Sequence, residues 1–195
     1  ARNNLQIPMF SPQTEWTPPD ELKDLSNAKQ IAIDLETRDP NLTTIGSGSV
    51  RKDGEIVGIA VAVDGWSGYY PIAHEGGGNI DKKITMNWFK DILQTPATKI
   101  FHNAMYDVSW IRSEGLSING RIVDTMIAAS LVNENRLRYN LDSLAKEYVG
   151  MGKSEKLLYE AAKEWGVNPK KEMWRLPAMH VGEYAEQDAV ATLKL

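Results

Sequence analysis

Two carboxylates close a short apolar segment near the start of the chain, within QIAIDLETRD at residues 30 to 39. If this segment is a strand, Ile31, Ile33 and Leu35 point to one face of a sheet. Ala32, Asp34 and Glu36 point to the other, where the two acids lie about 7 Å apart. Like charges this close repel, and removing them from water costs several kcal/mol unless a cation or hydrogen bonds compensate. The pair therefore suggests a bound positive charge.

Two further acids interrupt apolar helical stripes. Asp107 lies on the stripe of the segment AMYDVSWI, and Asp188 lies on that of VGEYAEQDAVATLKL, one turn after Tyr184. A single acid is more often a cap or a solvated charge than a ligand, and Asn103 ahead of Asp107 also fits a helix N-cap. These alternatives do not explain the combination, whereas a site shared with the first two acids does.

Four carboxylates without neighbouring basic residues favour hard divalent cations such as Mg²⁺ or Mn²⁺. Two such ions about 4 Å apart could activate water and stabilise the leaving oxygen of an in-line phosphoryl transfer. Tyr184 then has a role as a hydrogen-bonding group that orients the attacking water or the phosphate.

The composition narrows the class of protein. With 195 residues, 42% of them hydrophobic, the chain is long enough for one α/β domain. A net charge of -4 disfavours a protein that coats nucleic acid, although contact with a few nucleotides fits. Without cysteine, neither disulfides nor a cysteine-based zinc site can form. The longest apolar run, at residues 56 to 63, is too short to span a membrane, and we expect no membrane contact.

Strand and helix patterns alternate along most of the chain, which is typical of an α/β fold. Residues 1–27 read as an arm followed by a short helix begun by PPDELKDL, and residues 28–195 as the main domain. Asp64-Gly65 between two strand-like runs predicts a hairpin. Further elements are expected in DKKITMNWFKDIL (helix), TKIFH (strand), AMYDVSWIRSEG (helix), GRIVDTMIAASLV (strand into helix), and the helical LDSLAKEYVG, EKLLYEAAKEWG and VGEYAEQDAVATLKL.

The order of these motifs resembles a known family. The segments DLE, NAMYD and YAEQD resemble the D-x-E, N-x3-D and Y-x3-D motifs of the DnaQ-like, or DEDD, 3′-5′ exonucleases, and the tyrosine indicates the DEDDy subtype. Further segments, among them YYPIAH and VDTMIAASLVN, are similar to the proofreading domain of family A, polymerase I-like DNA polymerases. The resemblance covers roughly residues 28 to 195, with the largest departure at residues 150–178.

The resemblance implies an RNase H-like α/β fold, in which helices flank a central mixed five-stranded sheet. It also implies metal-dependent removal of nucleoside monophosphates from the 3′ end of single-stranded DNA. By position, two divalent cations, Mg²⁺ or Mn²⁺, would be held by Asp34, Glu36, Asp107 and Asp188, with Tyr184 orienting water.

Three residues are expected on the substrate side. Asn103 matches the asparagine of the second motif, and Leu42 corresponds to an apolar wedge against the terminal base, although the segment that carries it is lengthened here. Tyr106, beside Asp107, either contacts a nucleotide or packs.

The resemblance also predicts a larger parent protein, with a polymerase domain in the same chain and a place in the cytoplasm of a bacterium or a phage-infected cell. The last helix has no C-cap before Leu195, which agrees with that expectation. An exoribonuclease of the RNase D type would share all three motifs. A nuclease-like domain that only binds DNA is disfavoured, because all four acids and the tyrosine are present.

Overall fold

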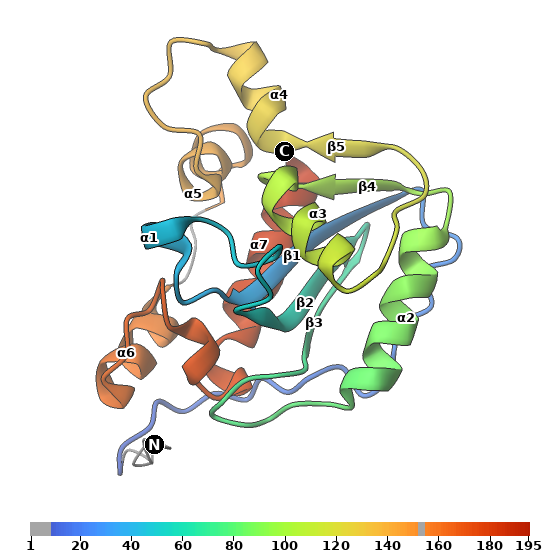
Figure 1. Ribbon diagram of the computed structural model, residues 1–195. Helices are drawn as coiled ribbons and strands as arrows, with labels where there is room; N and C mark the ends of the chain where they lie inside the picture. Colours follow the sequence, from blue (N-terminus) through green and yellow to red (C-terminus); the bar gives the residue numbers. More distant parts are fainter. Residues whose placement is uncertain (1–8, 152–154) are drawn as a thin grey trace.

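A computed structural model describes residues 9–151 and 155–195. Its centre is a mixed five-stranded sheet in the order β3-β2-β1-β4-β5 (Figure 1). β1 is antiparallel to β2 and parallel to β4, and the hairpin predicted at Asp64-Gly65 joins β2 to β3. The predicted fold class is thereby confirmed. The strands are β1 Gln30–Arg38, β2 Glu55–Val63, β3 Trp66–Pro71, β4 Thr98–Phe101 and β5 Ile122–Asp124.

Helices cover both faces of this sheet. α2 and α3 lie against one face and α7 against the other (Figure 1). The predicted LDSLAKEYVG helix is present, but its second half is a π-helix. The helical segments are α1 Leu42–Ile45, α2 Lys82–Gln94, α3 Ala104–Ser113, α4 Thr125–Val132, α5 Leu141–Leu144, the π-helix η1 Ala145–Val149, α6 Lys156–Trp165, the 3-10 helices η2 Met173–Arg175 and η3 Ala178–His180, and α7 Gly182–Lys194.

Strand β1 presents different residues to its two sides, as the alternation predicts. Ile33 and Leu35 pack in the apolar core beneath α2 and α3, together with Trp110. Ala32 faces the opposite way and packs in a second cluster that includes Ala185 of α7. The small side chains on this second face let the helix lie close to the sheet.

The acidic end of β1 extends beyond its neighbour β4. These strands pair only from Gln30 to Ala32 on β1, so Asp34 and Glu36 lie past the end of the parallel pairing. On its other side β1 stays paired with β2 as far as Arg38. One edge of the strand is thereby open at the acids.

A β-bulge follows immediately. Glu36 pairs with Gly58 and Thr37 with Ile56, so Val57 is an extra residue in β2. Gly58 is required there, because a Cβ atom would lie 1.9 Å from the hydroxyl oxygen of Tyr69.

The short helix expected within residues 20–25 is wrong. This segment has bends at residues 20 and 21 and no regular secondary structure at residues 22–25, and side chains remote in sequence satisfy several of its backbone groups. The Tyr70 hydroxyl accepts from the Lys23 N–H (3.1 Å) and donates to the carbonyl of Glu21 (3.1 Å). The Trp88 indole donates to the Lys23 carbonyl at 2.8 Å. The arm is thus fastened to β3 and α2 instead of coiling on itself.

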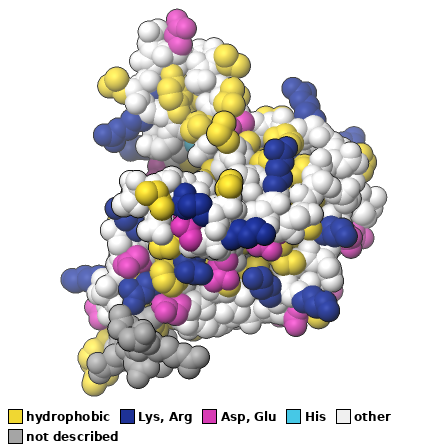
Figure 2. All heavy atoms as spheres, viewed as in Figure 1, with side chains coloured by type: hydrophobic (Ala, Val, Ile, Leu, Met, Phe, Trp, Pro, Cys, Tyr) yellow, Lys and Arg dark blue, Asp and Glu magenta, His cyan; other side chains and the backbone are white. Residues whose placement is uncertain are grey.

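The surface carries mixed charge. On the face drawn in Figure 2, acidic and basic side chains are interspersed, while hydrophobic ones gather over α4. Ile127 and Leu131 of this helix are exposed. No helix within residues 9–151 and 155–195 combines the length and apolar character needed to cross a membrane.

Candidate active site

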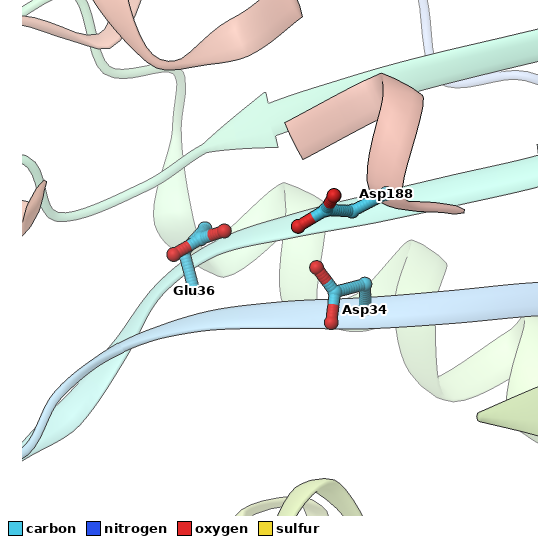
Figure 3. A group of neighbouring side chains, drawn as sticks. All are labelled: Asp34, Glu36 and Asp188. Carbon is cyan, nitrogen blue, oxygen red and sulfur yellow. The ribbon is translucent and has the colours of Figure 1, made fainter. Parts of the chain in front are cut away.

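Three of the predicted acids converge. Asp34, Glu36 and Asp188 each offer one carboxylate oxygen, and these atoms all lie within 4.8 Å of one another. In Figure 3 the Asp188 carboxylate reaches from α7 toward that of Asp34, and Glu36 turns toward the same space. Strand β1 supplies two of the acids and α7 the third, as the shared-face argument requires.

Asp107 approaches from α3 on the open side of β1. It is 4% exposed and accepts a backbone hydrogen bond from Leu35. Burial raises the pKa of Asp107 well above its usual range, and the negative charges of Asp34 and Glu36 raise it further. Within the described part of the chain, its Oδ2 atom has no hydrogen-bond partner. Asp107 therefore lies outside the group of three converging acids, but the negative charges of that group act on it.

The donor set fits a hard divalent cation. All the candidate ligand atoms are carboxylate oxygens, which Mg²⁺ and Mn²⁺ prefer. A buried oxygen without a partner and a raised carboxyl pKa both indicate that Asp107 lacks a nearby positive charge. A cation beside this residue would supply that charge.

Tyr184 lies one helical turn before Asp188 on α7. Burial raises the pKa of its hydroxyl, and the charge of Asp188 raises it further. The phenol therefore remains protonated at neutral pH, so it can donate a hydrogen bond but cannot serve as a base.

Asn103 occupies the N-cap position of α3 with a left-handed backbone (φ 65°), but its side chain makes no capping hydrogen bond. The expected N-cap position of Asn103 is therefore confirmed, but its side chain does not cap the helix. Asp124 supplies the cap instead, since it accepts from the N–H groups of Asn103 (3.0 Å) and Ala104 (2.8 Å). It also caps α4 through Met126 at 2.9 Å. The exposed Asn103 amide is left to face solvent at the start of α3.

Sequence reasoning missed Asp124. The available signal was its position directly before the helical run TMIAASLV, where an acid is a common N-cap. That it caps a second helix, the one bearing Asp107, depends on the parallel pairing of β4 with β5 and cannot be read from local sequence.

Tyr106 and Leu42 are placed outside the carboxylate group. The Tyr106 hydroxyl donates to Asp39 Oδ2 (3.0 Å) and shares a 2.8 Å hydrogen bond with Thr37 Oγ1. Burial raises its pKa to about 12. Asp39 also accepts from the N–H of Gly48, so this network ties α3 to the loop after β1. Leu42 opens α1 in that loop and is 41% exposed.

Tyr69 and His74 form a buried hydrogen-bonded pair close enough to the acids to be influenced by their charges. The Tyr69 hydroxyl hydrogen-bonds His74 Nε2 at 2.6 Å, and His74 Nδ1 contacts the Leu176 carbonyl at 3.0 Å. Because a carbonyl only accepts, Nδ1 carries the proton and Tyr69 is the donor. Burial lowers the pKa of His74 to about 4, so it is neutral. The pKa of Tyr69 is raised by burial and by the charges of Glu36 and Asp34.

The known sequences that this chain resembles are a 3′-5′ exonuclease family and DNA polymerases. A family profile described as 3′-5′ exonuclease matches residues 9–195. A DNA-directed DNA polymerase of Pseudomonas phage M6 is 36% identical over 98% of this chain and 30% of its own length. DNA polymerase I of Pseudomonas aeruginosa is 28% identical over 89% of this chain and 18% of its own. The chain thus spans less than a third of these relatives, and the resemblance to DNA polymerases is confirmed.

Solved structures share the fold. Brucella melitensis NrnC with bound Mg²⁺ matches with a TM-score of 0.56 and 20% identity, over 87% of this chain and 71% of NrnC. Escherichia coli RNase D matches with a TM-score of 0.54 and 18% identity, over 87% of this chain and 38% of RNase D. At identities of 20% and below, these matches concern the fold alone, and they agree with the predicted architecture.

Proposed function

Because the chain belongs to the 3′-5′ exonuclease family, we propose that it removes nucleoside monophosphates from the 3′ end of single-stranded DNA, as the proofreading domain of a DNA polymerase. The convergence of Asp34, Glu36 and Asp188 carries this proposal. DNA is the favoured substrate because the sequence relatives are DNA polymerases of bacteria and phages. The same relatives support a polymerase domain in the same parent chain and a location in the cytoplasm of a bacterium or a phage-infected cell as parts of this proposal.

The four acids are the proposed ligands of two divalent cations, Mg²⁺ or Mn²⁺. When bound, such ions supply activation of water and stabilisation of the leaving oxygen. Asp34 and Glu36 offer their oxygens from the rigid β1, and Asp188 from α7. The buried Asp107 on α3 offers an oxygen that has no hydrogen-bond partner within the described residues, in the field of Asp34 and Glu36. Ligands on three different elements require the whole fold to be in place.

The neighbouring residues have distinct proposed tasks. The protonated Tyr184 hydroxyl donates a hydrogen bond to the attacking water or to the scissile phosphate. The exposed Asn103 amide contacts the substrate backbone at the start of α3. Leu42 packs against the terminal base, and Tyr106 holds the loop that carries Leu42 through Asp39.

The direct test uses 5′-labelled single-stranded DNA with Mg²⁺ or Mn²⁺, a chelator control, and the variants Asp188→Ala and Asp91→Ala. Asp91 is an exposed acid on α2, so its variant controls for the loss of one carboxylate. We expect the wild type and Asp91→Ala to shorten the DNA from its 3′ end, and Asp188→Ala or chelation to stop the reaction. Intact DNA after incubation of the wild type with either metal would overturn the proposal.

An RNase D-like exoribonuclease is the second candidate, favoured by the structural match to RNase D. RNA of the same sequence separates the two, because the 2′-hydroxyl must be accommodated or rejected. Faster cleavage of RNA than of DNA would replace the first assignment. Tight DNA binding without cleavage of either nucleic acid would indicate the non-catalytic alternative.

A further inference from the structure

Helix α7 carries a third acid that points away from the active site. Glu186 lies two residues from both Tyr184 and Asp188, which is about 200° around a helix, so it projects from the opposite side of α7. Its carboxylate is half-buried among protein groups. The catalytic assignment does not use it.

Glu186 fastens α7 to the edge of the sheet. Its Oε1 atom accepts the backbone N–H of Tyr69 at 3.1 Å. β3 is an edge strand, and this hydrogen bond occupies an outward N–H group that the sheet leaves open. Tyr69 pairs with Ala60, and Ala60 pairs with Asp34, so one row across three strands joins the anchor of α7 to a candidate ligand.

The N-terminal arm completes the same anchor. The Trp16 indole N–H donates to Glu186 Oε1 at 3.1 Å, and its ring lies 6.0 Å from that of Tyr69. The indole also covers Gly182, the first residue of α7, where a Cβ atom would lie 2.1 Å from the Trp16 ring. Only glycine leaves room for this contact, two residues before Tyr184.

The arm is itself held beyond Trp16, at Pro19 and Lys23. Pro19 packs on Gly68 of β3, and the Lys23 backbone is hydrogen-bonded by Tyr70 and Trp88. Figure 1 shows the arm running along the lower side of the molecule and passing behind α2. Trp16 is therefore a fixed point against which α7 can be placed.

We propose that Glu186 and Trp16 are positioning residues of the exonuclease, which set the rotation and depth of α7 so that Tyr184 and Asp188 meet Asp34 and Glu36. The inference rests on the function proposed above. The part of the arm from Trp16 onward would then be needed for full exonuclease activity. The two residues act through α7 and contact neither metal nor substrate.

The test compares four variants of the 195-residue chain with the wild type: Glu186→Ala, Glu186→Gln, Trp16→Phe and Glu183→Ala. Glutamine keeps an acceptor oxygen, phenylalanine keeps an aromatic ring but removes the indole donor, and Glu183 is an exposed acid on the same helix. Four quantities are measured: kcat and KM on single-stranded DNA, the dissociation constant for Mn²⁺ without DNA by calorimetry, and the thermal melting temperature.

We expect Glu186→Ala to lower kcat by about 30-fold and to weaken Mn²⁺ binding by about tenfold, with KM within about twofold, because small displacements of catalytic groups are costly. Trp16→Phe should lower kcat by about threefold to tenfold, since one of the two donors to Glu186 remains. Glu186→Gln and Glu183→Ala should match the wild type within about twofold in kcat, KM and the Mn²⁺ dissociation constant, and their melting temperatures should equal that of the wild type.

Wild-type kcat and Mn²⁺ affinity in Glu186→Ala would overturn the inference, as would equal losses in Glu186→Gln, which would assign the effect to charge. If Glu186→Ala is unfolded at the assay temperature, Trp16→Phe decides, since it removes one hydrogen bond and retains a ring against Gly182. A wild type that binds Mn²⁺ but cleaves no nucleic acid refutes the proposed function alone, and the Mn²⁺ affinities still test the positioning.

Discussion

The two faces of the sheet are built from different side chains and serve different ends. On the face beneath α2 and α3, β1 presents Ile33 and Leu35 to a core that contains large residues such as Trp110. On the face beneath α7, it presents Ala32 and then two carboxylates. Burial of large apolar groups stabilises the fold, whereas crowding of carboxylates opposes it. The difference indicates that apolar burial, on the first face and around α7 on the second, must offset the repulsion among the acids at the end of β1.

Asp188→Ala, on the face beneath α7, should give the largest loss of activity without a loss of stability. We expect kcat to fall about 10³-fold or more, because a proposed metal ligand is lost. The melting temperature should stay the same or rise, since repulsion with Asp34 and Glu36 is relieved. Steady-state kinetics and a thermal melt without metal measure both effects. A large drop in the melting temperature would instead make Asp188 a stabilising residue.

Ile33→Ala makes the converse change on the other face of the same strand. Loss of this fully buried side chain should lower the free energy of unfolding by about 3 kcal/mol. The rate per folded molecule should remain near that of the wild type at a temperature where the variant is folded. Urea unfolding followed by kinetics checks this expectation. A kcat loss comparable to that of Asp188→Ala would show that the faces are not separable.

His74 gives the α7 face a pH dependence of stability. Its folded pKa of about 4 lies below the ordinary value of 6.5, so between these values the unfolded chain binds the proton and the folded chain does not. Stability should therefore fall as the pH falls, by about 2 kcal/mol from pH 7 to pH 5 through this group. Urea unfolding of the wild type and of His74→Gln at both pH values isolates the contribution. The same slope in both proteins would contradict it.

Asp124→Ala and Asp81→Ala compare two helix caps. Asp81 accepts from the Ile84 N–H and caps α2 alone, whereas Asp124 caps both α3 and α4. Each substitution should cost about 1 to 2 kcal/mol of stability. Only Asp124→Ala should also lower kcat, by about threefold to tenfold, because α3 carries Asp107. Equal kcat values in folded Asp124→Ala and Asp81→Ala would show that Asp124 does not position the active site.

Much of this arrangement could be predicted from local sequence. Alternation placed Asp34 and Glu36 on one face, and helical spacing turned Asp107 and Asp188 inward, because periodicity records which side of an element is buried. The helix expected within residues 20–25 was wrong, because hydrogen bonds from Tyr70 and Trp88, remote in sequence, satisfy that backbone. The double cap at Asp124 and the anchor at Glu186 also depend on contacts between distant segments.

The bulge at Val57 has a consequence for how much the chain can change in length. Glu36 and Gly58 are the last regular partners before it, and two further pairs follow, as far as Arg38 and Glu55. Between Arg38 and Glu55 the chain leaves the sheet through the segment that contains α1. Residues inserted into the loop between Arg38 and Glu55 would enlarge that loop without shifting the pairing of Asp34 with Ala60. A protein engineer could therefore lengthen this loop and keep the acids in register, provided that Leu42 and the hydrogen bonds from Gly48 to Asp39 are spared. A one-residue deletion within β2 upstream of the hairpin would displace the acids from their partners.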